Sequence, residues 1–359
     1  MNDNKKLREI EQAFEEYKKK KIEIIDKKLK LKGAVKAKFY YPITKLLLEL
    51  ITVFNKEHIY YLNERIVKTP KGRSIIYANT HKFKPDIEKI TLSLNKPSVM
   101  IASDFKNSYK TINGWYFSTR PTIFVDPYSK EDKNYTYKMM VEYLKDGNNC
   151  MIFPEAVWNL SDNKIVLETF FGTVRAALES NSVIVCTAIE RYGKKYIINR
   201  DDYLDVLEVV KKYGFKSFND INNYPDSQNI KNQIIKECNE ILRDKLATLT
   251  YEIWEYYAKE NGLESRKDIP TDYWPKFVKS LTDEWKGYKL SDNDEQKFQS
   301  KKDLELQEII LDINKIKNNL NIDNLFLFAN YDRYLKAKEV VNEYEKVKIK
   351  KYEGDRCDV

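Results

Sequence analysis

The stretch SIIYANTHKFKPD, residues 74–86, joins a short apolar run to one of the chain's two histidines. An apolar run of this length, bounded by polar residues, favours a buried β-strand. His81 follows the run, and Asp86 lies five positions later. A histidine held by a carboxylate can act as a general base near neutral pH. Spacing alone does not establish such a role, so the surrounding sequence has to decide it.

Similar apolar runs recur between residues 74 and 200 and alternate with segments of helical periodicity. This alternation is typical of α/β layering. The expected strands are SIIYAN (74–79), SVMIAS (98–103), PTIFVD (121–126), NCMIFP (149–154) and SVIVCTAIE (182–190). The expected helices between them are 86–94, 133–145 and 172–180. The sequence therefore predicts an α/β fold with a mixed sheet flanked by helices.

Two helical segments are expected before the first of these strands. Residues 5–32 carry a sparse apolar stripe between charged positions, namely Ile10, Phe14, Tyr17, Ile24 and Leu31. The segment 43–54 has a sharper stripe at i, i+3, i+4, i+7, i+8 and i+11, formed by Ile43, Leu46, Leu47, Leu50, Ile51 and Phe54. Such an amphipathic helix either packs its apolar stripe on the core or lies in a lipid headgroup region.

After about residue 228 the apolar spacing becomes helical, and the polar stretch 289–303 is the expected linker within this part. We expect a basic N-terminal helical segment (1–38), a catalytic domain (39–250) and a helical C-terminal extension (251–359). The C-terminal helices interleave tyrosines and lysines but also carry many acids. A basic groove for nucleic acid is therefore not expected.

The charge distribution and the cysteines of this 359-residue chain indicate its cellular environment. Its net charge is +8, and residues 18–38 hold ten lysines against Glu23 and Asp26. Such a segment suits an anionic membrane surface or a solvated helix face. The four cysteines are widely spaced, which predicts a reduced, cytosolic setting without disulfides. No signal region, membrane span or zinc site is expected.

Two further strand ends carry acidic residues. Asp126 ends one expected strand, and Glu155 follows another. Ligand sites in open α/β sheets gather at the carboxyl ends of strands, so both carboxylates are candidates to meet His81. Read singly, Asp126 also fits a turn before Pro127, and Glu155 fits the start of a helix.

In order and spacing, these blocks resemble the glycerolipid acyltransferase (lysophospholipid acyltransferase-like) family over roughly residues 40–250. His81 to Asp86 matches the family's H-x4-D block. Thr122 to Asp126 matches a strand close to G-x-I-F-[IV]-[DR]-R, and the match breaks at Pro127. Phe153 to Trp158 is similar to F-P-E-G-[ST]-R. Cys186 stands at the position of a mid-strand proline in a later family strand.

The resemblance implies transfer of a fatty acyl group from acyl-CoA or acyl carrier protein to a hydroxyl acceptor. His81 would be the general base, Asp86 would orient its ring, and Glu155 would bind the acceptor. No covalent acyl-enzyme, metal or further cofactor is implied. The resemblance also implies a lysolipid-like acceptor. The lysine-rich segment 18–38 and the apolar stripe of 43–54 together predict peripheral attachment at the anionic inner face of a membrane.

This sequence departs from the family where arginines hold an acceptor phosphate. Pro127 and Trp158 stand at those positions, so the bidentate contacts of two guanidinium groups are missing. Lys84 and Arg120 are candidate replacements, together with Asp126 as a further acceptor-side residue. Alternatively, Trp158 and Asn159 suit a headgroup without a phosphate. N- or O-acylation of an amine, peptide or glycan precursor, and a catalytically idle lipid-binding relative, remain alternatives.

Overall fold

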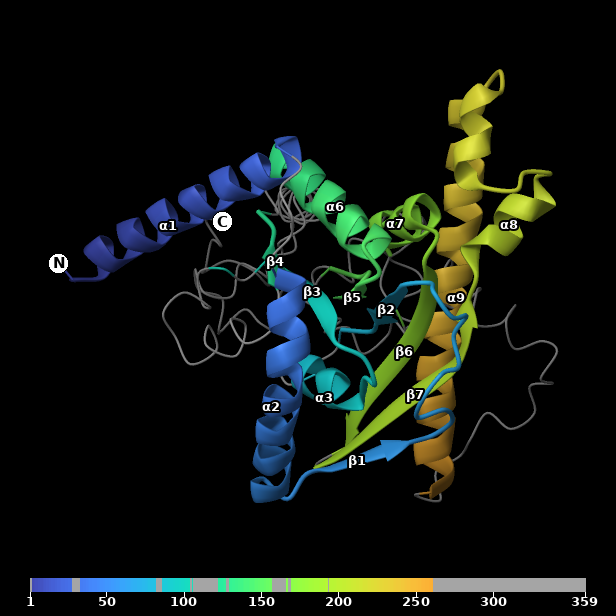
Figure 1. The fold of residues 1–359 in the computed structure, drawn as a ribbon. Helices are drawn as coiled ribbons and strands as arrows, with labels where there is room; N and C mark the ends of the chain where they lie inside the picture. Colours follow the sequence, from blue (N-terminus) through green and yellow to red (C-terminus); the bar gives the residue numbers. More distant parts are fainter. Residues whose placement is uncertain are drawn as a thin grey trace, which may run out of the picture.

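The computed structural model describes residues 2–27, 33–81, 86–103, 105, 122–126, 129–156, 166, 169–192 and 194–260. A seven-stranded sheet in the order β1-β7-β6-β2-β5-β3-β4 forms the centre of this described part. Helices cover both faces of the sheet (Figure 1). The α/β class with a mixed, helix-flanked sheet is therefore confirmed.

The strands divide into two directions. Neighbours from β6 to β4 pair in parallel, whereas β7 is antiparallel to β6 and β1 is parallel to β7. The five expected strands are present, as β2 (Ile75–Asn79), β3 (Ser98–Ala102), β4 (Thr122–Phe124), β5 (Asn149–Ile152) and β6 (Val183–Tyr192). The sequence did not predict β1 (His58–Tyr61) and β7 (Lys195–Leu204), which extend the sheet beyond β6.

The helices follow the expected periodicity with small changes at their ends. They are α1 (Asn2–Asp26), α2 (Gly33–Phe54), α3 (Asp86–Ser93), α6 (Lys130–Lys145), α7 (Gly172–Ser180), α8 (Val206–Lys212), the 3-10 helix η1 (Phe218–Asn223) and α9 (Ser227–Glu260). Helix α6 begins three residues earlier than expected. Its start is capped by the Ser129 hydroxyl, which accepts a hydrogen bond from the Asp132 amide at 3.1 Å.

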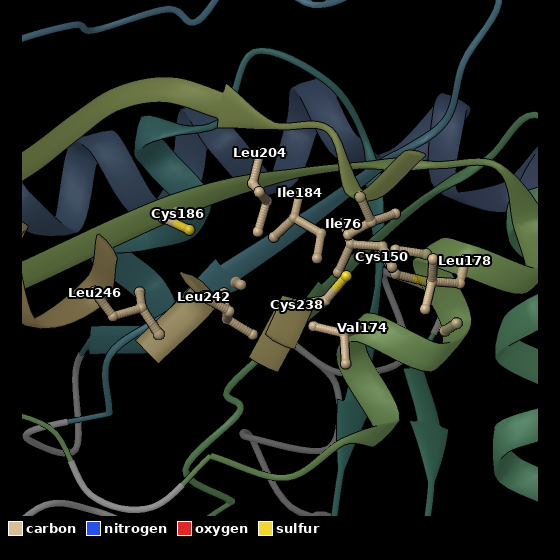
Figure 2. Close-up of a cluster of buried hydrophobic side chains, with 14 of the residues drawn as sticks. Ile76, Cys150, Val174, Leu178, Ile184, Cys186, Leu204, Cys238, Leu242 and Leu246 are labelled. Carbon is tan, nitrogen blue, oxygen red and sulfur yellow. The ribbon is translucent and has the colours of Figure 1, made fainter. Parts of the chain in front are cut away.

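One face of the sheet packs against α6, α7, α8 and α9. Figure 2 shows side chains of β2, β5 and β6 pointing toward α7 and α9, including Ile76, Cys150 and Ile184. Cys150, Cys186 and Cys238 are free and buried here. Burial raises the pKa of each of these thiols to about 12. They therefore behave as apolar core residues rather than as nucleophiles.

The alternate residues of the same strands build the opposite core. Ile75 and Tyr77 of β2 face it, with Ile90 and Leu94 at α3. Helix α2 runs beside α3 on this side of the sheet (Figure 1). The sheet thus buries side chains on both faces, which explains why its strands read as continuous apolar runs.

Helix α1 attaches to the body through its C-terminal half, while its N-terminal end projects outward (Figure 1). The Lys21 ammonium is buried and donates to Asp132 at 2.7 Å, to Thr136 at 2.8 Å and to the Phe124 carbonyl at 2.7 Å. Lys18 pairs with Asp126 at 3.0 Å. These two lysines hold α1 against the end of β4, so they are not part of a free basic surface.

Helix α2 is amphipathic as expected, but its polar side faces the protein. Thr44, Leu48 and Thr52 are buried. The predicted stripe is exposed instead: Ile43 49%, Leu46 56%, Leu47 36%, Leu50 45%, Ile51 48% and Phe54 81%. Packing of this stripe on the core, one of the two interpretations of the sequence, is therefore wrong in the described structure. No helix among the described residues has the length and apolarity to cross a bilayer.

The proposed domain limits fall inside helices. Helix α2 contains residues 38 and 39, and α9 contains residues 250 and 251 while packing against β6 and β7. The expected linker at 289–303 and most of the C-terminal extension lie outside the described residues.

Candidate active site

His81 stands directly after the central strand β2, and hydrogen bonds to β6 fix the residue before it. The Thr80 amide donates to the Thr187 carbonyl at 3.0 Å, and the Thr80 hydroxyl accepts from the Ile189 amide at 3.1 Å. Thr80 is fully buried. These bonds tie the end of β2 to β6, so His81 leaves the sheet from a defined position.

Asp86 is the first residue of α3 and meets the His81 ring. The distance from His81 Nδ1 to Asp86 Oδ2 is 2.8 Å, and the side chains are 13% and 0% exposed. A carboxylate at a helix N-terminus is stabilised by the helix dipole. The pair therefore joins a nearly buried imidazole to a buried carboxylate, the arrangement that orients a general-base histidine.

The Phe153 ring packs on the imidazole. The two ring centroids lie 4.3 Å apart with the planes tilted by 31°. Phe153 follows β5, which pairs with β2, so strand pairing brings the two rings together. This contact restricts rotation of His81 about its side-chain bonds. No sequence signal singles out Phe153 for this contact, because Phe153 stands out only as part of the F-P-E-G-[ST]-R block.

Glu155 is also brought to His81, through the backbone. The His81 amide donates to Glu155 Oε1 at 3.0 Å, and Glu155 is fully buried. The predicted role of Glu155 was acceptor binding. The described contact places its carboxylate against the main chain of His81, and its role in acceptor binding stays a prediction. A buried carboxylate that accepts a backbone hydrogen bond is a strong local constraint.

Ala156 ends the tight turn that contains Glu155 and directs it toward His81. Its φ is 60°, and its amide donates to the Phe153 carbonyl at 2.9 Å. A side chain in this left-handed region costs roughly 1–2 kcal/mol, which glycine avoids. Ala156 occupies the glycine position of the F-P-E-G block, so the structure explains why that block favours glycine there.

Replacing Ala156 by glycine is therefore expected to stabilise the fold. We expect Ala156→Gly to raise the free energy of unfolding by about 1 kcal/mol, because the strain at φ 60° is relieved. Urea unfolding followed by circular dichroism measures this. Ala176→Gly, inside α7, is the matched control and should lower the same quantity by a similar amount. A destabilised Ala156→Gly variant would contradict the strain argument.

Asp126 lies away from the histidine. It follows β4, which is three strands from β2 in the sheet order, or roughly 14 Å at the usual strand spacing. Its carboxylate pairs with Lys18, and its amide donates to Asp132 at 2.8 Å. The structure therefore brings Glu155 to His81 but does not bring Asp126 there.

The remaining candidates cannot be placed. Lys84, Arg120, Trp158 and Asn159, as well as Pro127, lie outside the described residues. Among the residues that are described, no group of three His, Cys, Asp or Glu side chains is arranged to hold a metal ion.

A comparison with protein-family models identifies the kind of enzyme domain in which this site lies. Residues 51–190 match the family model described as Acyltransferase, and this range contains His81, Asp86 and Glu155. These residues form an acyltransferase-family domain. The chain therefore carries an acyltransferase-family domain and is an enzyme that transfers acyl groups, which requires an acyl donor and a lipid acceptor.

A similar solved structure is the crystal structure of the 1-acyl-sn-glycerophosphate (LPA) acyltransferase PlsC from Thermotoga maritima. It is 16% identical, with a TM-score of 0.39, and the match covers 56% of this chain and 80% of that chain. No curated protein matches the sequence.

Proposed function

We propose that this acyltransferase moves a fatty acyl group from a thioester, either acyl-CoA or acyl carrier protein, to the hydroxyl of a lysolipid-like acceptor. His81 is the general base, and Asp86 orients it. The observation that carries this proposal is the 2.8 Å contact between His81 Nδ1 and the buried Asp86 carboxylate, within the acyltransferase-family domain.

The reaction follows from this geometry. With Nδ1–H donating to Asp86, His81 Nε2 takes the proton of the acceptor hydroxyl as its oxygen attacks the thioester carbonyl carbon. A C–O bond forms, the C–S bond breaks, and the proton passes from Nε2 to the departing thiolate. Asp86 stabilises the imidazolium that exists between these steps. Glu155 keeps the His81 backbone in place while the ring changes charge.

No cysteine acyl intermediate enters this mechanism. Cys150, Cys186 and Cys238 are buried, and their pKa values are raised to about 12 by burial. Their thiolate population at neutral pH is too small for nucleophilic catalysis. Direct attack by the acceptor therefore fits the described residues better than a two-step transfer.

We further propose that the acceptor lacks a terminal phosphomonoester. Pro127 and Trp158 stand where the family carries phosphate-binding arginines, and each lost charge-assisted hydrogen bond is worth about 1.5–3 kcal/mol. Trp158 and Asn159 then offer a flat apolar face and an amide to a zwitterionic, sugar or amine headgroup. The alternative is that Lys84 and Arg120 replace the missing arginines.

Mass spectrometry of reaction products tests the acceptor. With palmitoyl-CoA as donor, we expect lysophosphatidylcholine to be acylated at least about tenfold faster than glycerol 3-phosphate or lysophosphatidic acid, because one lost contact already corresponds to about tenfold. Lys84→Ala and Arg120→Ala should leave the Michaelis constants nearly unchanged. Efficient acylation of lysophosphatidic acid that is lost in either variant would overturn this assignment.

We also propose that the enzyme binds peripherally to the anionic inner face of a membrane, through α2. The exposed stripe of Ile43, Leu46, Leu47, Leu50, Ile51 and Phe54 presents apolar side chains along one helix. The lysine-rich segment 18–38 precedes and overlaps this helix, although Lys18 and Lys21 are engaged within the protein. Apolar burial combined with basic charge is the recognised basis of interfacial binding.

A further inference from the structure

Helix α3 carries the catalytic carboxylate but is too short to position it alone. It spans eight residues, Asp86–Ser93. Isolated helices of this length are unstable in water, so tertiary contacts must hold it. A shift of α3 by one residue moves Asp86 by about 1.5 Å along the helix axis. The 2.8 Å contact with His81 would not survive such a shift.

The middle of α3 is held by an ion pair between a buried lysine and a partly buried glutamate. Lys89 is 2% exposed, and its ammonium donates to Glu57 and, at 2.9 Å, to the Thr52 hydroxyl. Glu57 also accepts from the Tyr196 hydroxyl at 3.0 Å. Although burial opposes it, the hydrogen bonds from Lys89 and Tyr196 lower the pKa of Glu57, so this carboxylate is ionised at neutral pH. Lys89 thus joins α3 to the end of α2.

The C-terminal end of α3 is held by donors from two other elements. Tyr41 of α2 donates to the Thr91 and Leu94 carbonyls at 3.2 and 2.9 Å, and Lys45 donates to the Leu94 carbonyl at 3.3 Å. Arg200 of β7 donates to the Ser93 carbonyl at 2.9 Å. Cations at a helix C-terminus complement its dipole. The Thr91 carbonyl also accepts from the Leu94 amide at 3.3 Å, whereas the Ser93 and Leu94 carbonyls lie at the end of the helix, beyond its last intrahelical donors.

Arg200 is itself fixed by the sheet. It also donates to the Thr187 hydroxyl and the Arg65 carbonyl, both at 3.0 Å, and it is 3% exposed. Burial lowers the pKa of Arg200 to about 10, which leaves it charged at neutral pH. We refer to Tyr41, Lys45, Thr52, Glu57, Lys89 and Arg200 as the α3 anchor.

The α3 anchor also explains the orientation of α2. Tyr41, Lys45 and Thr52 occupy the side of α2 that faces α3, and the apolar stripe is left on the outside. Polar contacts are directional, so they fix the register of α3 against α2 more narrowly than apolar packing does. A buried ion pair adds little net stability compared with apolar packing, which is consistent with a positioning role.

We propose that Lys89 is a positioning residue for catalysis: through the α3 anchor, it sets the place of Asp86 and hence the orientation of His81. This inference rests on the proposed His81–Asp86 mechanism. A misplacement of about 1 Å can cost on the order of 100-fold in rate. We therefore expect Lys89→Met to lower kcat by about 10–100-fold. The Michaelis constant for palmitoyl-CoA should change by less than about threefold, because Lys89 is 2% exposed and its ammonium is bound by Glu57 and Thr52.

A double-mutant cycle with Asp86→Asn tests the inference in the full-length protein, with palmitoyl-CoA and lysophosphatidylcholine as probes. If Lys89 acts through Asp86, then Lys89→Met should cost less than about twofold in the Asp86→Asn background. An equal loss in both backgrounds would show a merely structural role and overturn the proposal, as would wild-type kcat in Lys89→Met. Activity that survives Asp86→Asn unchanged would instead contradict the proposed mechanism itself.

Two less disruptive variants keep the proposal testable if Lys89→Met does not fold. Thr52→Val removes one partner of Lys89, and Glu57→Gln removes the charge of the other. Both should lower kcat by a smaller factor, again only where Asp86 is intact. Lys145→Met, which breaks an exposed pair with Glu142 on α6, is the matched control and should leave kcat unchanged. Loss of activity in the control equal to that in Thr52→Val would also overturn the proposal.

Discussion

His81→Ala is expected to lower kcat by about 10²–10⁴-fold, the range that general-base assistance typically supplies. The acceptor hydroxyl would then have no positioned group to receive its proton as it attacks the thioester. The Michaelis constants should change little, because the imidazole acts mainly in the transition state. Single-turnover assays with palmitoyl-CoA and lysophosphatidylcholine separate this chemical step from product release.

The chain supplies a close control for that experiment. His58 is its only other histidine and is exposed at the start of β1, so His58→Ala should retain wild-type kcat. Asp86→Asn should approach the loss seen in His81→Ala, because an amide does not stabilise the imidazolium. A His81→Ala enzyme that keeps more than about a tenth of wild-type turnover would show that another group is the base.

The second large effect concerns the exposed stripe of α2. Leu46→Glu with Leu50→Glu is expected to abolish sedimentation with anionic vesicles. Each leucine contributes up to about 1.5–3 kcal/mol when fully buried in an apolar phase, and the pair therefore corresponds to roughly 10²–10⁴-fold in binding. The glutamates add repulsion from anionic headgroups. The fold should be preserved, because both side chains are exposed, at 56% and 45%.

Exposed apolar residues outside α2 provide a control for the vesicle-binding experiment. Ile66 and Tyr224 are 51% and 54% exposed, and Ile66→Glu with Tyr224→Glu should bind vesicles like the wild type. Binding of the wild type should also fall with added salt and on neutral vesicles, since charge on the lysine-rich segment contributes. Equal binding of both double variants would show that α2 is not the membrane-facing element.

The sequence by itself determined the strand set around the site and the His81–Asp86 pair. Strands buried on both faces are read as unbroken apolar runs, and β2 to β6 have this pattern. The strands β1 and β7 escaped prediction for two reasons. Strand β1 has only four residues and lies at the sheet edge. In strand β7, Arg200, Asp201 and Asp202 interrupt the apolar run. Short or interrupted runs do not carry a period-2 signal.

The positions of Glu155 and Asp126 and the backbone conformation of Ala156 depend on the tertiary structure and could not be read from the sequence. The strand order places β5 beside β2 and β4 at the sheet edge, so Glu155 reaches His81 whereas Asp126 pairs with Lys18. Both carboxylates stand at strand ends in the sequence, and that position alone cannot distinguish them. The left-handed conformation of Ala156 is likewise visible only in the folded backbone.

The orientation of α2 shows the same limit most clearly. The periodicity of α2 identifies the residues of its apolar stripe. It does not show whether the apolar or the polar side of the helix packs against the protein. That choice was made by α3, whose C-terminal carbonyls and buried Lys89 require polar partners, and Tyr41, Lys45 and Thr52 provide them. Because unmet buried hydrogen bonds cost more than exposed apolar side chains, the polar side of α2 faces inward and its apolar side remains outside.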